Sequence, residues 1–563
     1  MPAPLADADR QFLGELAAGF ATRDRTLLDC LHAIQGKWGF LPRAALEEFG
    51  FEARLAREQV HSAATFYTGF RYEPPPEVEI RVCDTLTCHL AGAERVLVQA
   101  RGLADAYGAG RWEAGPAPCL GLCEQAPAML VNGAACSARA GVEPAIAAAR
   151  MGAARPSLPR LAAYRAEGGY ALLDRAAREP AWATQELKAS GLRGMGGAGF
   201  PAGSKWEFVQ RAKGAPKYVV LNADEGEPGT FKDRWLLETR PHAVLDGMLL
   251  AMAGVGAERG VIYLREEYGA AGAALRSAMA EIQEAGLVGK PWPNGVTPAL
   301  QLVVGAGSYV CGEETAMLES IEGKRGEPRL KPPYPAQVGL WGKPTLIHNV
   351  ETLAWVPRIL AQGSAWWRAQ GREGSPGRKL LSVSGHVNEP GVVDVPLGVT
   401  FRELFEEHAG GFPRGAPPKA FVPGGLASGL LPWSKADVRV DFDALAKEGS
   451  MLGSGGVVAI PPGTCLVELA ENGLAFFAHE SCGKCTPCRA GTEKLLHTCR
   501  ALRAGRASRE QVALMGELSD AMAAASICGL GQTAMNPFLH GLRFFREEFE
   551  AHLEGRCPEG VCR

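Results

Sequence analysis

Three cysteines near the C-terminus have the spacing of metal ligands. Cys482, Cys485 and Cys488 lie three residues apart in SCGKCTPCRAG. This double C-x-x-C spacing lets one tight loop direct three thiolates at a single centre, as a [4Fe-4S] cluster requires. We predict Cys528 as the fourth ligand, because in SICGLGQ it lies at a helix-to-loop junction beside glycines that free the backbone.

Several alternatives exist for these C-terminal cysteines. A zinc site is one, although zinc sites usually pair two separated C-x-x-C knuckles, and three buried thiols are another. Cys499 is an alternative fourth ligand, but it falls inside the helical pattern EKLLHTCRALR, which is more typical of a small core residue. We interpret Cys557 and Cys562 in the terminal CPEGVC as tail thiols, because chain termini are usually mobile.

A second group of cysteines lies in the N-terminal part. Cys83 and Cys88 are five residues apart, and Cys119 and Cys123 are four apart further along the chain. Two close pairs, each just beyond an expected strand, can converge on one [2Fe-2S] centre. A zinc ribbon is the alternative, although zinc ribbons favour shorter C-x-x-C pairs. The cysteines without paired spacing are interpreted as core thiols: Cys30, Cys136, Cys311 and Cys465.

A glycine-rich loop is the first candidate for binding phosphate. In GLRGMGGAGFPAG, Gly194, Gly196 and Gly199 form a G-x-G-x-x-G pattern. The preceding TQELKAS is helical in pattern, whereas the dinucleotide fingerprint needs a strand there, so we predict that this is not an ordinary Rossmann turn. Its backbone amides can still approach a phosphate, with Lys205 as a charge partner. A flexible surface loop is the alternative.

Two acidic segments follow strand-like runs. NADEGEPGTFKD comes after KYVVL, and CGEETAMLES comes after LVVGAGSYV. Carboxylates at strand ends usually meet a ligand or cap a helix. A helix N-terminus explains Glu313 and Glu314 almost as well as a ligand does.

Composition limits the class of protein. With 563 residues we expect several domains. A net charge of −3 gives no long-range field for nucleic acid or an anionic membrane. The N-terminal residues lack a secretory signal, and no apolar run is long enough for a membrane helix. Fifteen cysteines without a secretory signal predict a cytoplasmic protein whose thiols bind metal rather than form disulfides.

The elements that position these motifs fall into five expected domains. Residues 1–75 have the three- and four-residue periodicity of helices, and 76–150 form a small α/β unit before ARPSLPRL, which reads as a linker. Residues 151–378 alternate apolar runs with helical stretches, which favours a parallel sheet covered by helices. Residues 379–462 hold short strands broken by Gly and Pro, and 463–563 are helical again.

Taken together, these motifs resemble a known family. GMGGAGFPAGSKW, NADEGEPGTFKD, GAGSYVCGEETAMLESIEGKRGEPR, KPPYPAQVGLWGKPTLIHNVETL and SCGKCTPCRAGT resemble the flavin-carrying, NADH-binding subunit of respiratory complex I, over roughly residues 160–563. The first 150 residues resemble the small [2Fe-2S] subunit, here fused. Such fusion is typical of diaphorase subunits of NAD-reducing hydrogenases and of beta subunits of NAD-dependent formate dehydrogenases. YRAEGGYALLDR, EGEPGTFKDRW, SICGLGQTAMNP and the complete N-terminal cysteine set are closest to the formate dehydrogenase beta subunit.

The resemblance implies a multidomain α/β and α+β fold. Its parts are an N-terminal helical bundle with a thioredoxin-like [2Fe-2S] domain, a Rossmann-like FMN domain, a small β-grasp-like (ubiquitin-like) domain and a C-terminal helical bundle with the [4Fe-4S] cluster. The implied FMN contacts are Gly194, Gly196, Gly197, Lys205, Asn222, Asp224, Glu225, Gly312, Glu313, Glu314, Asn349 and Thr352. The implied NAD contacts are Phe200, Phe208, Glu227, Lys331 and Tyr334, with Glu227 positioning the nicotinamide.

The sequence departs from the family at two places beside the implied FMN site. Met195 stands where relatives commonly have Arg, and His348 where the first of two adjacent Asn residues is usual. These two differences affect individual contacts to FMN, and binding of the flavin itself is still expected. For His348, a hydrogen-bonded structural histidine is at least as good an interpretation as a ligand contact.

The resemblance also implies a function and a partner. A large molybdenum- or tungsten-containing alpha subunit, with further iron–sulfur clusters, would oxidise formate within a hetero-oligomer. This chain would be the diaphorase subunit that passes the electrons through [4Fe-4S] and FMN to NAD+, with no acid or nucleophile of its own. The alternatives are the diaphorase subunit of a NAD-reducing or bifurcating hydrogenase, and a non-catalytic iron–sulfur redox sensor. No nucleic-acid or membrane partner is expected.

Overall fold

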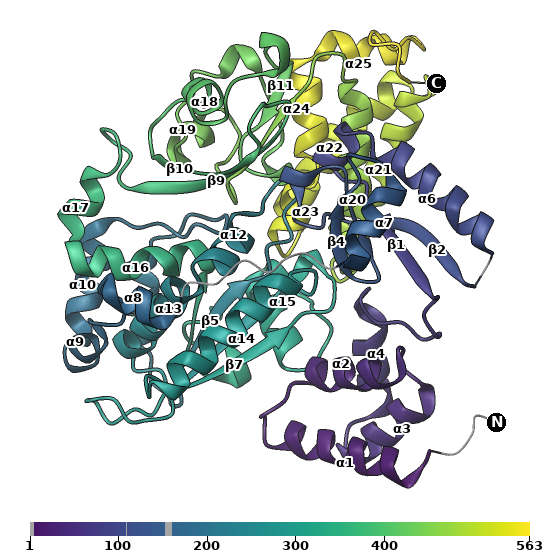
Figure 1. Ribbon diagram of the computed structural model, residues 1–563. Helices are drawn as coiled ribbons and strands as arrows, with labels where there is room; N and C mark the ends of the chain where they lie inside the picture. The colour runs from purple at the N-terminus through teal and green to yellow at the C-terminus, as the bar shows by residue number, and fades with distance from the viewer. Residues whose placement is uncertain (1–4, 109, 152–159, 563) are drawn as a thin grey trace.

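The N-terminal part of the chain is a group of four helices. The computed structural model describes residues 5–108, 110–151 and 160–562. The second helix begins at a capping box, in which the Thr26 side chain accepts from the Asp29 amide and Asp29 accepts in return. The helices pack against a face of a central sheet, since one apolar core joins Leu31 and Ile34 to Val220 and Val261. The helices are α1 (Asp7–Ala21), α2 (Leu27–Trp38), α3 (Arg43–Glu52) and α4 (Arg57–Phe66) (Figure 1).

A small α/β unit follows, with strand order β2-β1-β3-β4. β1 and β2 run parallel, while β3 pairs antiparallel with both β1 and β4. The β3–β4 hairpin turns through Asn132 and Gly133, both with positive φ, as a two-residue hairpin of this kind requires. The elements are β1 (Val78–Cys83), α5 (Thr87–Leu90), α6 (Ala93–Tyr107), β2 (Trp112–Ala117), β3 (Ala128–Val131), β4 (Ala134–Ser137) and α7 (Val142–Met151). Of the linker expected in ARPSLPRL, all but Arg160 and Leu161 lie outside the described residues.

The central unit is built on a four-stranded sheet in which every pairing is parallel, as the alternating pattern predicts. The strand order is β7-β6-β5-β8, from β5 (Tyr218–Ala223), β6 (Arg259–Leu264), β7 (Ala299–Val304) and β8 (Thr345–Asn349). Asn222 on β5 is level with Asn349 on β8. The carboxyl ends of all four strands therefore meet at one edge, where ligands bind in open parallel sheets.

Helices surround this sheet. α13 is buried along its whole length and packs against α16, forming a large apolar core on one face. The helices of this unit are α8 (Leu161–Ala166), α9 (Leu173–Arg178), α10 (Pro180–Ser190), α11 (Ala202–Arg211), α12 (Lys232–Thr239), α13 (Pro241–Val255), α14 (Gly269–Glu284), α15 (Glu314–Ile321), α16 (Val350–Gln362) and α17 (Ser364–Ala369).

A second, mixed sheet follows with strand order β10-β9-β13-β11-β12. β13 runs parallel to β9, and the other pairings are antiparallel. The strands are β9 (Arg378–Gly385), β10 (Gly391–Pro396), β11 (Ala420–Val422), β12 (Leu431–Pro432) and β13 (Gly456–Ile460), with the helices α18 (Phe401–Glu403) and α19 (Phe442–Lys447) beside them.

The last hundred residues are helical, as expected. Figure 1 shows these helices next to the N-terminal α/β unit, and Asn472 on α20 joins the two by bonding the Leu86 amide and the Asp84 carbonyl, each at 2.9 Å. The helices are α20 (Leu466–Glu480), α21 (Thr486–Arg503), α22 (Arg509–Ala525), α23 (Gly529–Thr533), α24 (Asn536–Phe544) and α25 (Arg546–Leu553). None of the helices in the described part of the chain is both long and apolar enough to cross a membrane.

Candidate functional site

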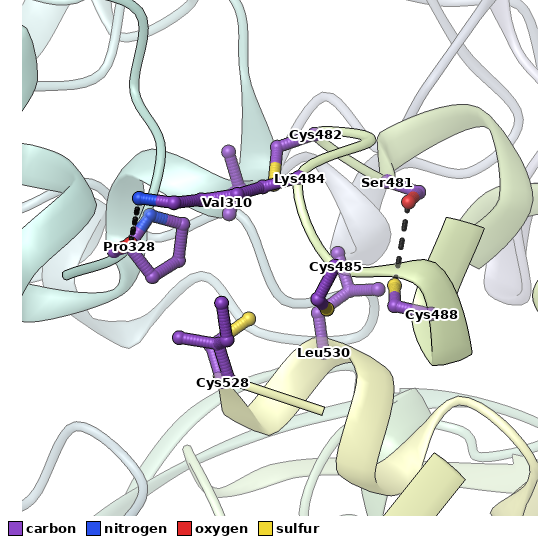
Figure 2. Close-up of a pocket in the computed structure, with 10 residues that line it drawn as sticks. Val310, Pro328, Ser481, Cys482, Lys484, Cys485, Cys488, Cys528 and Leu530 are labelled. Atoms are coloured by element: carbon purple, nitrogen blue, oxygen red, sulfur yellow. Dashed lines mark hydrogen bonds between the residues drawn. The ribbon is translucent and has the colours of Figure 1, made fainter. Parts of the chain in front are cut away.

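The four C-terminal cysteines predicted as cluster ligands line one small pocket (Figure 2). Cys482 lies in the loop after α20, Cys485 is the N-cap of α21, and Cys488 lies in its first turn. Cys528 is the N-cap of α23 and faces the other three across the pocket. Cys499 is elsewhere, buried on α21 with its thiol directed at the Val467 carbonyl at 3.6 Å. The structure thus favours Cys528 over Cys499 as the fourth ligand.

Local structure fixes this cysteine loop. Lys484 donates to the Pro328 carbonyl at 2.7 Å, which ties the loop to the central unit. Gly531 has no room for a side chain, because a Cβ there would lie 2.8 Å from the Cβ of Cys488. Burial raises the pKa of Cys488 to about 11 and that of Cys528 to about 12. Such thiols ionise readily only beside a cationic centre.

The four N-terminal cysteines also converge, and all four are buried. Cys83 ends β1 level with Ala117 at the end of β2, so the two cysteine pairs emerge at the same edge of the sheet. Cys88 lies on α5, and Cys123 begins the short helix η1 (Cys123–Gln125). The loop that carries Cys119 is held on the central unit by Arg265, which donates to the Cys119 carbonyl.

The spacing of the sulfurs separates clusters from single ions. Tetrahedral zinc with Zn–S bonds of about 2.3 Å holds its sulfurs about 3.8 Å apart. Within the part of the chain that the structure describes, neither predicted cysteine set has ligand atoms that all lie within 4.8 Å of one another. The wider arrangement fits an iron–sulfur cluster better than the zinc sites considered as alternatives.

A cavity of about 1250 Å³ opens at the carboxyl edge of the parallel sheet. It is lined by every residue expected to contact FMN or NAD except Thr352. The Thr352 hydroxyl is instead fully buried and accepts from the Met195 amide at 2.9 Å, so it supports the glycine loop from behind.

The glycine loop forms one wall of this cavity. It follows helix α10 rather than a strand, which agrees with the prediction that it is not an ordinary Rossmann turn. A bridge between Arg193 and Pro201 closes the loop. A Cβ on Gly196 would lie 2.9 Å from that of Asn349, so only glycine fits there. The backbone itself therefore forms the wall, as a phosphate-binding loop requires.

Charged side chains form a second wall. Lys205 donates to Glu314 at 3.0 Å, and Lys331 donates to Glu313 at 2.7 Å. Glu313 also caps α15 by accepting from the amides of Thr315 and Ala316, as its position after a strand suggested. Burial raises the pKa of Glu314, but Lys205 and Lys331 outweigh it and hold that pKa below its usual value.

The acidic loop after β5 also lines the cavity. The Asn222 side chain donates to the Gly312 carbonyl at 2.8 Å, which joins this loop to the one after β7. Glu225 turns inward to accept from the amides of Asp233 and Arg234. Burial raises the pKa of Asp224 to about 8.

Aromatic side chains stand at the outer end of the cavity. Phe200, Phe208 and Tyr334 are 44%, 51% and 55% exposed, which is unusual for large apolar rings. The Phe200 and Phe208 rings lie 6.3 Å apart. Exposed rings along a cavity wall offer stacking surfaces for a planar base.

The two departures from the family pattern are buried. Met195 packs in the apolar core. His348 is 4% exposed and accepts from the Trp206 indole nitrogen at 2.9 Å, and burial lowers the pKa of His348 to about 3. It is a neutral, hydrogen-bonded histidine at the cavity wall, which matches the structural interpretation.

Sequence reasoning did not single out two other features of the cavity. Tyr309 lines it and donates to Glu227. Lys232 and Asp233 also line it, and they join Glu351 and Lys379 in a fully buried ion network. Lys232 and Asp233 stand in the quoted NADEGEPGTFKD segment, but nothing local signals their pairing with Glu351 more than a hundred residues later.

Four regions of the chain match known protein families. Residues 187–358 match the Nuo51 FMN-binding domain, and 468–552 the NADH-ubiquinone oxidoreductase-F iron–sulfur binding region. Residues 13–143 match the thioredoxin-like [2Fe-2S] ferredoxin family, and 380–425 the SLBB domain. The F 2 subunit of the NADH-quinone oxidoreductase of Rhizobium meliloti (strain 1021) is 47% identical over 402 residues, covering 71% of this chain and 96% of the relative.

The chain belongs to the family of NADH-quinone oxidoreductase F subunits. Another similar protein, the HndC subunit of the NADP-reducing hydrogenase of Solidesulfovibrio fructosivorans, is 42% identical over 385 residues, 68% of this chain and 78% of the relative. The crystal structure of a NAD+-reducing [NiFe]-hydrogenase in its H2-reduced state contains a similar chain, with a TM-score of 0.83 at 33% identity over 94% of both chains.

These matches together confirm the predicted fold class and cofactors. The chain is a NAD(H)-dependent flavin iron–sulfur oxidoreductase subunit with FMN, NADH, [4Fe-4S] and [2Fe-2S] as its cofactors. The donor sets fit these groups: two sets of four thiols, a side-chain-free glycine wall, and exposed rings beside a large cavity.

Proposed function

We propose that this chain is the electron-transfer subunit of a cytoplasmic, metal-dependent formate dehydrogenase. Its partner is a large molybdenum- or tungsten-containing subunit with further iron–sulfur clusters, in a hetero-oligomer. Formate oxidation releases CO2, a proton and two electrons, and reduction of NAD+ to NADH takes up the same two electrons and proton. None of the fifteen cysteines forms a disulfide in the structure, which suits the reducing conditions of the cytoplasm.

One observation carries the electron-transfer part of this proposal. Cys528 lines both the cysteine pocket and the large cavity, and Val310 and Leu530 do the same. The predicted cluster ligands and the predicted nucleotide contacts are thus separated by a single layer of side chains. This arrangement suits a short path for electrons between a one-electron carrier and a hydride acceptor.

The residues of the chain have positioning roles in this proposal. Bound FMN supplies the exchange between one-electron and hydride chemistry. The glycine wall and Lys205 would hold its phosphate, and Asn222, Asp224 and Asn349, which line the same cavity, would hold its other polar groups. Glu313, Glu314 and Lys331 fix the shape of the wall beside it through their mutual ion pairs.

For the nucleotide, Phe200, Phe208 and Tyr334 offer stacking surfaces for the adenine, and Glu227 positions the nicotinamide. The cluster ligands are Cys482, Cys485, Cys488 and Cys528 for [4Fe-4S], and Cys83, Cys88, Cys119 and Cys123 for [2Fe-2S].

Formate as the electron source is supported by the sequence segments and the complete N-terminal cysteine set. A specific observation favours a second candidate, the diaphorase subunit of a NAD-reducing hydrogenase. The hydrogenase chain aligns with this one over 94% of both, so it has the same fused organisation.

Purification of the native complex decides between the two. We expect a copurifying large subunit with molybdenum or tungsten, and NAD+ reduction that depends on formate. Nickel in the partner together with hydrogen-dependent NAD+ reduction would establish the hydrogenase candidate instead. The isolated chain provides a further check, since NADH must bleach its flavin. Protein without flavin and without NADH-dependent ferricyanide reduction would leave a redox sensor as the function.

A further inference from the structure

A third group of potential metal ligands, made of residues that belong to neither predicted cluster set, brings the last residues of the chain to the start of α20. It consists of Cys465, His552, Cys557 and Cys562, and the ligand atoms all lie within 4.8 Å of one another. Cys465 is the N-cap of α20, His552 lies on α25, and the two other cysteines follow in the tail. Within the described residues this is the one group of His, Cys, Asp or Glu with single-ion spacing.

The interatomic distances are those of a compact tetrahedral site. Cys465 Sγ lies 3.4 Å from His552 Nε2 and 3.5 Å from Cys562 Sγ. Zinc bonds of about 2.3 Å to sulfur and 2.0–2.1 Å to nitrogen place such atoms about 3.6 and 3.8 Å apart in a tetrahedron. Cys465 and Cys562 are too far apart to be bonded as a disulfide, whose S–S bond is about 2.05 Å.

The histidine is oriented as a metal ligand. His552 Nδ1 lies 2.7 Å from the Glu548 carbonyl, so Nδ1 carries the proton and donates it there. Nε2 is then left with its lone pair facing the sulfurs. A backbone carbonyl on the second ring nitrogen is the usual way in which proteins fix the tautomer of a ligand histidine.

A partly buried lysine holds the three segments of the site together. Lys419 donates to the Thr464 carbonyl at 2.8 Å, and to Glu548 and Glu559 at 2.7 Å each. These partners lie next to Cys465, on the helix of His552, and between the two tail cysteines. Glu548 also accepts from the Leu466 amide at 2.7 Å. The four ligands are therefore held in place by contacts outside the group itself.

The tail makes the turn that the site needs. The Gly560 amide donates to the Cys557 carbonyl at 3.0 Å, and Gly560 has φ +68°, which favours glycine. The turn brings Cys562 back to Cys465.

We propose that Cys465, His552, Cys557 and Cys562 bind a structural zinc ion that fastens the C-terminal tail to α20 and α25. A tetrahedral set of three thiolates and one imidazole suits zinc among the biological metals. All four positions are filled by protein, as in structural rather than catalytic zinc sites. The ion takes no part in electron transfer, because zinc has no redox chemistry. This inference does not depend on which electron donor the complex uses.

Metal analysis and X-ray absorption of the full chain, purified with its cofactors, test this proposal. We expect about one zinc per chain, and a zinc-edge spectrum with three sulfurs at about 2.3 Å and one nitrogen at about 2.0–2.1 Å. Wild-type protein that carries no zinc even after incubation with Zn²⁺ would overturn the proposal. So would a Cys557–Cys562 disulfide found by mass spectrometry, or a zinc shell made only of oxygen and nitrogen.

Variants provide a second test. Cys557→Ser and Cys562→Ser should each lower zinc retention at least tenfold after mild chelation, while iron content and flavin content stay unchanged. Cys499→Ser is the matched control, since Cys499 is a buried cysteine of the same helical region outside the group, and it should retain zinc like the wild type. Equal zinc retention in the tail variants and the control would contradict the assignment.

Discussion

Tyr309 donates its hydroxyl hydrogen to Glu227 at 2.5 Å inside the large cavity. The Ala427 amide donates to the other carboxylate oxygen at 2.7 Å. Tyr309 also packs on Phe476 of α20, with ring centroids 5.1 Å apart. The carboxylate proposed to position the nicotinamide is thus joined to the helix that leads to the cysteine pocket.

A pH-dependent affinity for NADH follows from this pair. Burial raises the pKa of Glu227 to about 7, although the Ala427 amide and the Tyr309 hydroxyl lower it. Glu227 is therefore neutral below pH 7 and charged above, where it repels the anionic nucleotide by about 1 kcal/mol, or roughly fivefold in KM. We expect KM for NADH to rise through pH 7 in the parent and to stay low and flat in Glu227→Gln.

Tyr309→Phe is the companion variant. It removes a hydrogen bond to the charged carboxylate, so the pKa of Glu227 rises and the step in KM moves to higher pH. Steady-state NADH–ferricyanide assays between pH 6 and 9 on the three proteins measure both effects. A step that persists unchanged in Glu227→Gln would assign the titration to another group.

The cysteine pocket predicts a selective loss of iron. Cys528→Ser should lose the [4Fe-4S] cluster, because one of its four thiolate ligands is gone, while FMN and the [2Fe-2S] centre stay bound. Iron per chain should fall by about four relative to the parent, and electron transfer between NADH and the partner subunit should fall at least a hundredfold. Cys499→Ser should keep the full iron content. The opposite result for the two variants would make Cys499 the fourth ligand.

Local patterns predicted most of the fold. Sequence patterns identify the strands β5, β6 and β7 and the closely spaced cysteines, because each of these features depends on residues that are close in sequence. β2 was not foreseen, since WEAGPA has a Gly and a Pro and no β-branched residue, and it is a strand only through its parallel pairing with β1.

Long-range pairing explains what the sequence could not predict at the sites. Cys465 and Cys562 are 97 positions apart, so no spacing rule connects them. From the sequence, Cys465 is interpreted as a core thiol and Cys562 as a tail thiol. Thr352 was assigned to FMN by resemblance, but tertiary packing turns its hydroxyl to the Met195 amide. Lys232, Glu351 and Lys379 meet only because three separate segments pack behind the cavity.

That buried ion network predicts a large cost for a small change. Glu351 is fully buried and accepts from Lys379 at 3.0 Å and from Lys232 at 3.1 Å. Glu351→Gln removes the carboxylate partner of Lys379 and leaves Lys232 with Asp233 alone, and breaking a buried ion pair in this way costs about 3–5 kcal/mol. We expect a lower apparent melting temperature and loss of FMN on gel filtration, because Lys232 and its neighbour Asp233 line the cavity.

A surface pair is the control for the buried network. Arg402 and Asp437 form an ion pair at 2.8 Å, but the Asp437 side chain is 70% exposed, so Asp437→Asn should change neither property. Glu351→Gln protein that melts like the parent and keeps its FMN would show that the network contributes little.

Asp246 gives a stability effect with a defined pH range. It is 2% exposed, and one of its oxygens accepts from the Tyr170 amide and the Tyr164 hydroxyl while the other has no partner in the described structure. Burial raises the pKa of Asp246 from 3.8 to about 6, although those two donors lower it. The folded chain therefore binds this proton more tightly than the unfolded chain does. Stability is lost as the pH rises from about 4 to 6, and the loss is complete above that range.

Asp246→Asn removes this dependence. Between pH 5 and pH 8 the parent loses about 1–2 kcal/mol through this carboxyl, and the variant does not. The melting temperature of Asp246→Asn minus that of the parent should therefore increase by roughly 1–4 °C over the same range, measured by differential scanning fluorimetry. Asp437→Asn should give a difference that does not change with pH, because Arg402 holds the pKa of Asp437 below its usual value and the carboxyl is ionised throughout. A pH-independent difference for Asp246→Asn as well would mean that Asp246 is charged in the folded protein at pH 5.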